Sequence, residues 1–357
     1  MTMLDIATLE DEARKVLDPG AYDYIVGGAD DELTVLDNVS AWSRLRLLPH
    51  VLRDVSEVST DVSLYGANLS SPVFVAPCAY QRLVHEDGES EMARAAARAG
   101  SLMCVSTMAT VSLEDVADAS GGAPLWFQLY VHRDRDLTAD LVLRAEAAGY
   151  QAMVFTVDVA VLGRRKRDER NSFSLPPGLE MANMRAAVPV GEGSGLDAYA
   201  DSSFDSSINF EDIGWLRGIT DLPVIVKGIV RADDADAAIR AGAQGIVVSN
   251  HGGRQLDTTV AAADALGPVV SAVAGRVPVL ADGGIRSGSD VLKALALGAD
   301  AVLVGRPLLW ALATGGADLA AALMDQMRDE LRRAMALCGA ATLGALQEDL
   351  VLAPRDD

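Results

Sequence analysis

The sequence of 357 residues is poor in cysteine, and the few cysteines it has lie far apart. Cys78, Cys104 and Cys338 form neither the disulfide framework of a small secreted domain nor the close spacing of a metal site. We therefore expect three reduced thiols, no metal ion and a cytoplasmic location.

Basic residues are also scarce relative to acidic ones. The chain has 30 Lys and Arg against 51 Asp and Glu, which gives a formal net charge of −21 at pH 7. This balance excludes a simple nucleic-acid binder, and it disfavours a protein held to anionic lipid by a basic patch. The sequence has no uncharged apolar run of about 18 residues, and its first residues carry acids from Asp5 onward instead of the basic start of a signal peptide. We expect no nucleic-acid partner and no membrane partner.

Half of the residues are hydrophobic, and from residue 73 onward they form a repeating pattern. Short β-branched runs alternate with Ala- and Leu-rich segments of helical period. The predicted strands span 73–77, 103–107, 125–130, 152–158, 223–227, 245–250, 278–282 and 301–305. The predicted helices span 89–100, 113–120, 136–148, 210–218, 232–241, 259–274, 288–297 and 307–338. The strands are apolar throughout, which is typical of parallel strands buried on both faces.

Eight strand–helix units in succession predict an α/β fold, a (β/α)8 TIM barrel, which typically needs about 250 residues. We expect residues 1–357 to form one domain with an N-terminal helical cap (1–72), the barrel (73–339) and a C-terminal tail (340–357). The stretch 159–209 after the fourth strand is too long for an ordinary connection. It is either a lid over the active face or a disordered insertion, and both descriptions hold if it orders when substrate binds.

A doubly wound sheet is the rival architecture, and it requires a Gly-x-Gly-x-x-Gly turn after the first strand. That strand leads instead into residues 77–80, with the sequence Pro-Cys-Ala-Tyr. The glycine cluster at residues 191–195 follows no strand. A dinucleotide-binding fold is therefore excluded.

Polar residues gather where the predicted strands end, which is the catalytic edge of this type of barrel. The loops after the last two strands carry Gly284, Arg286, Gly305 and Arg306. Glycine lets the backbone approach an anion and the arginines add positive charge, so we expect a phosphate site there. Lys227 ends an otherwise apolar strand, where a plain core role is unexpected but an ion pair with a carboxylate stays open.

His251 is the candidate acid–base residue, because it follows the sixth strand and is one of four histidines. The other three do not end a strand, and for His132 we expect a solvated loop position. Asp158, which ends the fourth strand, could orient His251 across the barrel mouth. Arg254 lies three residues after His251 and could grip a carboxylate. Together they suggest a substrate with a carboxylate beside its reacting carbon.

Residues 249–257, SNHGGRQLD, resemble the signature of the FMN-dependent α-hydroxy-acid oxidases and dehydrogenases. This family includes glycolate oxidase, lactate oxidase and mandelate dehydrogenase. Further matches extend along nearly the whole chain, from residues 22–24 to the region of Met335. Within the family, residues 79–83 are most similar to the 4-hydroxymandelate oxidases. The resemblance implies an FMN-dependent (S)-2-hydroxy-acid oxidase.

The resemblance also implies a role for each matching residue. The residues that would contact FMN are Pro77, Ala79, Ser106, Gln128, Thr156, Lys227, Ser249, Asp282, Gly284, Arg286, Gly305 and Arg306. The residues that would take part in catalysis are His251 as base, Asp158 as its partner, Lys227 beside the flavin, and Tyr130. The residues that would bind the substrate are Tyr24, Met108, Tyr130, Arg165 and Arg254, with the two arginines on its carboxylate.

Two positions bear on the substrate and on the electron acceptor. Met108 stands where glycolate oxidase has a tryptophan. A flexible thioether leaves a larger apolar pocket, which favours mandelate or 4-hydroxymandelate, although a mere packing role for Met108 stays open. Ala79 matches the oxidases, whereas the mandelate dehydrogenases have glycine there, so we expect O2 as acceptor and H2O2 as product. The resemblance further implies a homo-oligomer, commonly a tetramer.

Several alternatives stay open. A dehydrogenase would pass the electrons to another acceptor, and an aliphatic enzyme would use lactate or glycolate. A barrel lyase, in which Lys227 forms a Schiff base with a phosphorylated carbonyl substrate, would use the same phosphate site without a flavin. A non-catalytic flavin- or phosphate-binding protein would leave the set of His251, Asp158 and Arg254 without a purpose.

Overall fold

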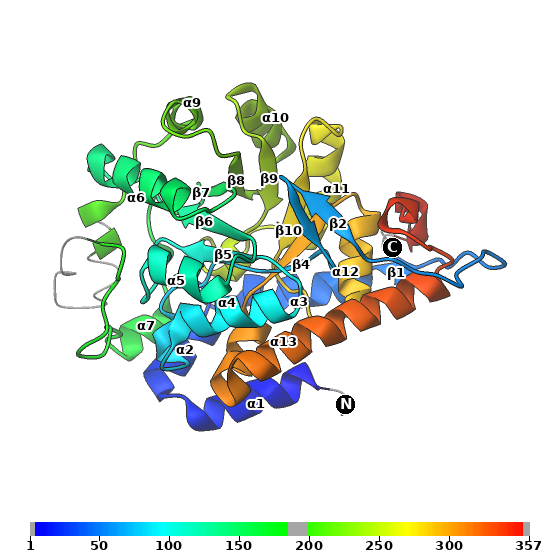
Figure 1. The fold of residues 1–357 in the computed structure, drawn as a ribbon, viewed down its shortest axis with the longest axis horizontal. Helices are drawn as coiled ribbons and strands as arrows, with labels where there is room; N and C mark the ends of the chain where they lie inside the picture. The colour runs from blue at the N-terminus through cyan, green and yellow to red at the C-terminus, as the bar shows by residue number, and fades with distance from the viewer. Residues whose placement is uncertain (1–3, 185–198, 201, 353–357) are drawn as a thin grey trace.

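The computed structural model describes residues 4–184, 199–200 and 202–352. Its centre is a closed barrel of parallel strands with helices around it (Figure 1). The strands are β4 (Val73–Val75), β5 (Met103–Ser106), β6 (Leu125–Leu129), β7 (Met153–Thr156), β8 (Val224–Ile229), β9 (Gly245–Val248), β10 (Val279–Asp282) and β11 (Ala301–Val304). They follow one another in chain order, and β11 pairs with β4 to close the barrel. The predicted (β/α)8 barrel is confirmed.

The interior of the barrel is filled by apolar side chains. Successive strand residues point to opposite faces, so every second residue points inward. The inward-facing residues form one buried cluster that includes Phe74, Cys104, Trp126, Val154, Ile225, Val247, Leu280 and Leu303. The hairpin of β2 (Val62–Leu64) and β3 (Ala67–Leu69) packs onto this cluster, and Tyr65 Oη donates to the carbonyl of Gln244 at 2.6 Å, directly before β9. The hairpin therefore covers the end of the barrel where the strands begin.

The outward-facing strand residues pack beneath the surrounding helices. These helices are α4 (Gly88–Arg98), α5 (Leu113–Ser120), α6 (Arg135–Ala147), α9 (Glu211–Arg217), α10 (Ala232–Arg240), α11 (Ala262–Val273), α12 (Gly288–Ala296) and α13 (Arg306–Leu337). Ser112, Asp134 and Ser287 cap the starts of α5, α6 and α12 by accepting backbone N–H groups. The predicted helices are confirmed, but α13 is interrupted at Gly315 and Gly316, where the backbone is not helical.

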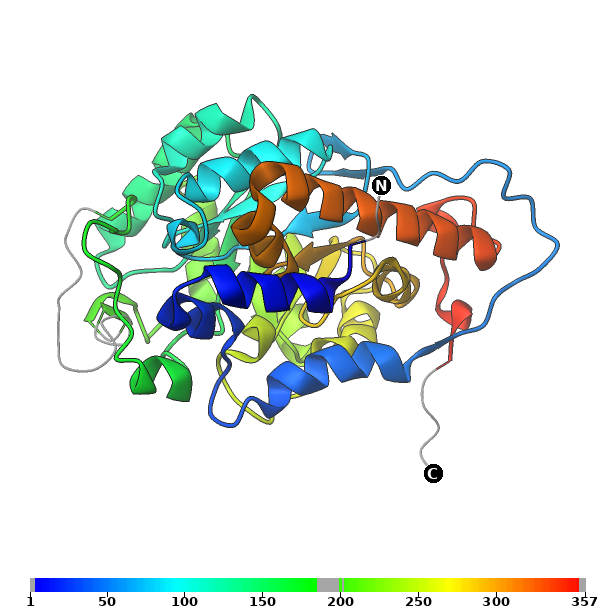
Figure 2. The same ribbon diagram turned by 90° about the horizontal axis from the view of Figure 1, so that it is seen from below.

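The N-terminal segment consists of α1 (Ile6–Val16), α2 (Pro19–Val26) and α3 (Leu33–Arg44). Helix α1 lies along α13 (Figure 2), and α3 packs against α11 and against the 3-10 turn η2 (His251–Gly253). Asp257 fixes the start of α3, because its carboxylate accepts the N–H groups of Leu33 at 3.4 Å and Thr34 at 2.8 Å. The N-terminal segment is thereby anchored to the loop that follows β9.

The stretch 159–209 is described only in part, because residues 185–198 and 201 lie outside the described residues. The glycine cluster at 191–195 is among them. The first part contains α7 (Lys166–Arg170), and the last part returns to the end of β6 through a β-bridge between His132 and Phe204. Both described parts border the barrel mouth. A lid function for this stretch stays a prediction.

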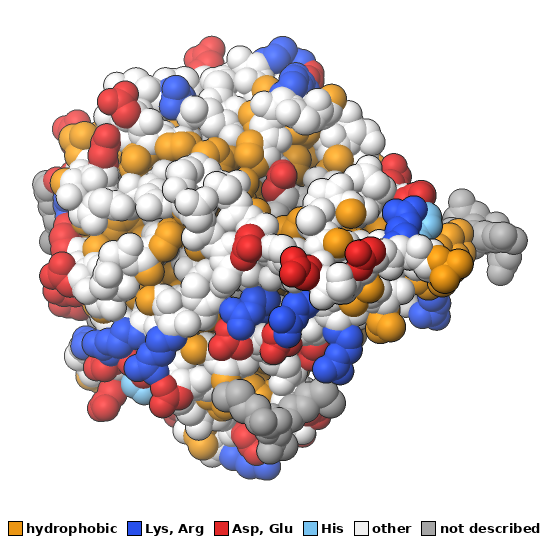
Figure 3. Space-filling view, turned by 45° about the vertical axis from the view of Figure 1, so that its right-hand side comes forward, with side chains coloured by type: hydrophobic (Ala, Val, Ile, Leu, Met, Phe, Trp, Pro, Cys, Tyr) orange, Lys and Arg blue, Asp and Glu red, His pale blue; other side chains and the backbone are white. Residues whose placement is uncertain are grey.

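The segment before β2 and the end of the chain lie together. β1 (Arg46–Leu47) pairs antiparallel with β12 (Val351–Leu352), which follows the 3-10 turns η3 (Leu343–Ala345) and η4 (Glu348–Leu350). The chain between β1 and β2 then projects from the body (Figures 1 and 2). On the face shown in Figure 3, Lys and Arg side chains lie beside Asp and Glu side chains. The projecting chain also exposes the apolar side chains Leu48, Val51 and Leu52.

Helix α13 is the one helix in the described part of the chain that is long and apolar enough to cross a membrane. Most of its apolar stretch is buried, and it packs against α1, α4 and α12. These contacts are those of a core helix. The cytoplasmic location and the absence of a membrane partner stay predictions.

Candidate active site

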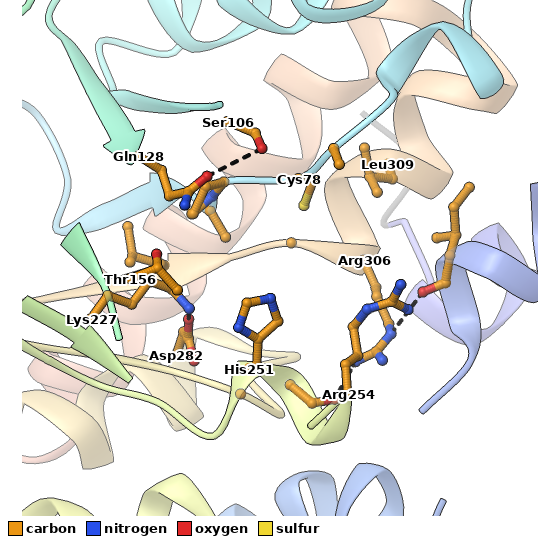
Figure 4. A pocket seen from close by; sticks show the side chains of 18 of the residues that line it. Cys78, Ser106, Gln128, Thr156, Lys227, His251, Arg254, Asp282, Arg306 and Leu309 are labelled. Carbon is orange, nitrogen blue, oxygen red and sulfur yellow. Dashed lines mark hydrogen bonds and ion pairs between the residues drawn. The ribbon is translucent and has the colours of Figure 1, made fainter. Parts of the chain in front are cut away.

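A pocket opens at the end of the barrel where the strands finish. Its floor follows from the strand period, because the residue two positions after an inward-facing apolar residue also points inward. Five strands place a polar side chain at the floor of the pocket, namely Ser106, Gln128, Thr156, Lys227 and Asp282. Figure 4 shows these side chains on one side of His251, with Arg254 and Arg306 on the other.

His251 and Asp158 are in contact, as the sequence suggested. His251 Nδ1 lies 2.9 Å from Asp158 Oδ1, which leaves Nε2 for the pocket. Burial lowers the pKa of His251, and this effect outweighs the opposite effect of Asp158. Burial alone would raise the pKa of Asp158, but the contact with His251 outweighs it and the pKa lies below its usual value. His251 is therefore neutral at pH 7, with Nδ1–H toward a carboxylate, and in this state Nε2 can accept a proton.

Lys227 is buried in an ion pair. Its Nζ lies 3.1 Å from Asp282 Oδ2 and donates to Ser249 Oγ at 3.0 Å. Burial alone would lower the pKa of Lys227, but Asp282 and Asp158 outweigh burial and the pKa lies above its usual value. A Schiff-base lysine needs a lowered pKa, so this arrangement argues against the lyase alternative. The ion pair instead keeps the positive charge of Lys227 at a fixed position in the site.

Arg165 and Arg254 both line the pocket, and both carry a positive charge. Burial, and then the charge of Arg254, lower the pKa of Arg165 to about 10. Arg254 lies over the ring of Tyr24 at 4.8 Å, and its Nη1 donates to the carbonyls of Tyr24 at 2.6 Å and Gly27 at 2.9 Å. Buried like charges repel, and an anion between them would relieve that repulsion. The pair suits the carboxylate that the sequence predicts.

Two further arginines stand at the loops after β10 and β11. Arg286 lies over the ring of Trp310 at 5.5 Å. Arg306 donates to backbone carbonyls, those of Ile25, Gly27 and Gly252. Burial, and then the charges of Arg254 and Arg286, lower the pKa of Arg306 to about 9. The concentrated positive charge favours an anion at these loops.

The backbone requires glycine at position 284 for a reason other than the anion site that the sequence predicts. Its φ is +83°, in the left-handed region that favours glycine. A Cβ on Gly284 would also overlap the backbone carbonyl of Asn38 in α3. The close approach of α3 therefore requires glycine here, whether or not an anion binds.

An apolar wall borders the pocket, and the sequence pointed to only part of it. The sequence indicates Met108 but not Val159, Leu162 and Phe204, which line the same pocket. The rings of Phe204 and Tyr130 pack with centroids 4.6 Å apart. The signal in the sequence was weak, because Phe204 is a lone aromatic residue in the polar cluster at 201–207. This wall can hold an apolar substituent of the substrate.

His132 is not the solvated residue that the sequence suggested. It is 1% exposed, and its Nε2 lies 3.3 Å from Tyr199 Oη. The reason is the bridge between His132 and Phe204, which brings the Phe204 ring within 5.5 Å of the imidazole ring. Burial lowers the pKa of His132 to about 4, so its ring is neutral at pH 7.

The pocket brings together most of the residues that the sequence singled out. Its lining includes Tyr24, Pro77, Ala79, Ser106, Met108, Gln128, Tyr130, Thr156, Arg165, Lys227, His251, Arg254, Asp282, Gly284, Arg286, Gly305 and Arg306. The two others, Asp158 and Ser249, are not among the lining residues, but each forms a hydrogen bond with His251. Lining residues that the sequence did not single out as site residues include Ile25, Cys78, Val159, Leu162, Phe204, Gly252 and Leu309.

Several buried polar atoms at the pocket have no hydrogen-bond partner among the described residues. They are Gln128 Nε2, Thr156 Oγ1 and Asp282 Oδ1. Such atoms are rare in folded proteins unless a ligand or water satisfies them. The ring, ribityl chain and phosphate of FMN offer acceptors, donors and negative charge for these atoms and for the arginines at the loops. The residues present therefore fit FMN.

Known proteins resemble this chain along its length. The FMN-dependent dehydrogenase family matches residues 13–353. A 4-hydroxymandelate oxidase of Amycolatopsis orientalis is 48% identical over 97% of each chain. An L-lactate oxidase of Nostoc sp. is 47% identical over 95% of each chain. A crystal structure of mandelate oxidase with (S)-4-hydroxymandelic acid matches with a TM-score of 0.93 at 45% identity, over 98% of both chains. The chain therefore belongs to the FMN-dependent dehydrogenase family, as an FMN-dependent oxidase of 2-hydroxy acids.

Proposed function

We propose that the protein oxidises an (S)-2-hydroxy acid with an aryl side chain, mandelate or 4-hydroxymandelate, to the 2-oxo acid. The observation that carries this proposal is the apolar wall of Met108, Leu162 and Phe204 in the same pocket as His251 and Arg165. An aryl ring would lie on the wall while the carboxylate meets the arginine. The 48% identity to a 4-hydroxymandelate oxidase supports this assignment.

The substrate would be held by its polar groups. Arg165 and Arg254 would bind the carboxylate through charge-assisted hydrogen bonds. The phenols of Tyr24 and Tyr130 would donate to the carboxylate or to the hydroxyl. Burial raises the pKa of both tyrosines, so both stay protonated and can donate.

His251 would take the substrate proton on Nε2. FMN, when bound, supplies the acceptor for the two electrons that leave the α-carbon. Asp158 would keep the imidazole oriented through Nδ1 and stabilise its protonated form, because the carboxylate is 2.9 Å away. Lys227 would offset the negative charge that reduction adds, since its ammonium group is held in place by Asp282 and Ser249.

We further propose O2 as the electron acceptor, so that the second product is H2O2. Ala79 lines the pocket, and the resemblance associates this residue with oxidases. The named oxidases among the relatives support the same acceptor. A dehydrogenase with another acceptor is the alternative, and the speed of reoxidation in air distinguishes the two.

An aliphatic 2-hydroxy acid is the second candidate substrate, because an L-lactate oxidase is 47% identical. A methyl group would cover little of the apolar wall. Each further buried CH2 contributes about 0.8 kcal/mol, so a phenyl group gains several times more from the same surface. The wall therefore favours the aryl acid.

The test is an anaerobic absorption spectrum of the flavin-loaded protein with (S)-mandelate, followed by air, with L-lactate and glycolate in parallel. Bleaching by mandelate at lower concentration than by lactate, followed by prompt recovery in air, is the expected result. Preferential bleaching by lactate or glycolate would assign the aliphatic substrate, and slow recovery in air would assign a dehydrogenase. His251→Ala is the control, since it should retain FMN and resist bleaching.

We also propose that the protein is a homo-oligomer, a tetramer by resemblance. Val51 and Leu52 on the projecting chain are 77% and 103% exposed, and a second copy would cover them. Light scattering during gel filtration should show several chains per particle, and Val51→Asp should lower the mass. A wild-type monomer would contradict the proposal.

A further inference from the structure

Asn38 lies in α3, outside the pocket, and has a buried side chain that is 2% exposed. Its carboxamide faces that of Asn250, the residue before His251. Asn38 Nδ2 donates to Asn250 Oδ1 at 2.8 Å, and Asn250 Nδ2 donates to Asn38 Oδ1 at 2.8 Å. The two side chains form a reciprocal amide pair between the N-terminal segment and the catalytic loop.

The remaining hydrogen bonds of this pair hold both ends of that loop. Asn250 Oδ1 also accepts from the Gly253 N–H at 3.2 Å. Asn250 Nδ2 also donates to the Val260 carbonyl at 3.0 Å. Asn38 Oδ1 also accepts from the Ala262 N–H at 3.1 Å. Removal of the Asn38 carboxamide would leave one N–H of the Asn250 amide and the N–H of Ala262 buried without partners, which is unfavourable.

The backbone of the loop needs such support. His251 has φ of +58°, and Gly252 and Gly253 follow with +62° and +77°. The left-handed region is unfavourable for a residue with a Cβ and persists where the surroundings impose it. Around His251, those surroundings are Ser249 Oγ, which accepts the His251 N–H at 3.0 Å, and the amide pair.

We propose that Asn38 is a positioning residue for His251. It acts through Asn250 to hold the left-handed turn, which keeps His251 Nδ1 on Asp158 and aims Nε2 at the pocket. This inference rests on the proposed role of His251 as base. Arg165 lies outside this turn, and the Arg254 guanidinium is held separately by the carbonyls of Tyr24 and Gly27. Loss of Asn38 should therefore reduce the rate of flavin reduction and leave substrate affinity nearly unchanged.

The test measures flavin reduction by (S)-mandelate, or by L-lactate if mandelate is not a substrate, in the flavin-loaded protein. Asn38→Ala should slow the limiting rate of flavin reduction by about 10- to 100-fold, as expected for a misplaced base. The substrate concentration that gives half of this limiting rate should change little. The acid limb of its pH profile should move to lower pH, because a looser contact with Asp158 no longer raises the pKa of His251.

A double-mutant cycle and a matched control separate positioning from general destabilisation. In an Asn250→Ala background, Asn38→Ala should cost nothing further. Ala41→Gly weakens the same helix at another buried position, without a polar change, and should lower the melting temperature but preserve the rate. Additive losses, an equal loss in Ala41→Gly or an unshifted pH profile would overturn the inference. Normal reduction in His251→Ala would instead overturn the proposed function.

Discussion

Replacement of Lys227 by Met should destabilise the protein, because it leaves Asp282 buried without its cation. The Asp282 side chain is 10% exposed, and the Lys227 ammonium group is 3.1 Å from it. Ser249 would also lose a donor. Removal of one partner from a buried ion pair costs about 3–5 kcal/mol. That is a large share of the roughly 5–15 kcal/mol by which a typical protein is stable.

The destabilisation should depend on pH in a defined direction. A buried carboxylate without a cation takes up a proton more readily in the folded chain than in the unfolded chain. Folded Lys227→Met would then bind more protons than its unfolded state, so its stability would fall as pH rises. The loss of stability relative to wild type should therefore be smaller near about pH 5 than near about pH 8.

Urea unfolding of the flavin-free protein at these two pH values measures the effect. Without flavin, a change in cofactor affinity does not enter the comparison. The matched control is Lys227→Met with Asp282→Leu, which removes both charges and should recover most of the lost stability. A loss below about 1 kcal/mol at the higher pH would be the size of a surface pair and would refute the reasoning. An equal loss at both pH values would refute it as well.

Four other predictions concern the reaction itself. The pKa of His251 lies below its usual value, so flavin reduction should persist below about pH 6.5. Asp158→Asn should move the acid limb of the pH profile to still lower pH and slow flavin reduction by about 10²- to 10⁴-fold. Stopped-flow measurements across pH test this prediction, and an acid limb at the wild-type position would contradict it. Arg165→Met should raise KM for the hydroxy acid by about 10- to 100-fold with FMN still bound, and an unchanged KM would remove Arg165 from the carboxylate site. Met108→Trp should lower kcat/KM for mandelate more than for lactate, and equal losses would show that the wall is assigned wrongly.

The strand period explains why so much of the site could be predicted. In β6, Trp126 fills the barrel interior, and Gln128 follows two positions later at the mouth. The same step leads from Ile225 to Lys227 in β8. Because side-chain direction repeats every second residue, a polar residue in this position must face the pocket once the barrel is known. The fold and the polar floor of the site are thus encoded locally.

The remaining features depend on segments that are far apart in the chain. His132 is buried only because Phe204 pairs with it from the far end of a long stretch. Gly284 must be glycine because Asn38 in α3 approaches it. Neither of these contacts produces a periodic pattern in the sequence around His132 or Gly284. One sequence does not indicate which distant segments meet, so neither the burial of His132 nor the place of Phe204 in the apolar wall could be anticipated.

Unfavourable states are concentrated at the mouth of the barrel. Arg165 and Arg306 have lowered pKa values because burial and like charges oppose their ionisation. His251 has a left-handed backbone, and Lys227 is buried as an ion. Below this layer the barrel is filled with apolar side chains and covered by the β2–β3 hairpin. The apolar core supplies the stability that such strained groups reduce, so an anion bound at the mouth should stabilise the fold as well as enter the reaction.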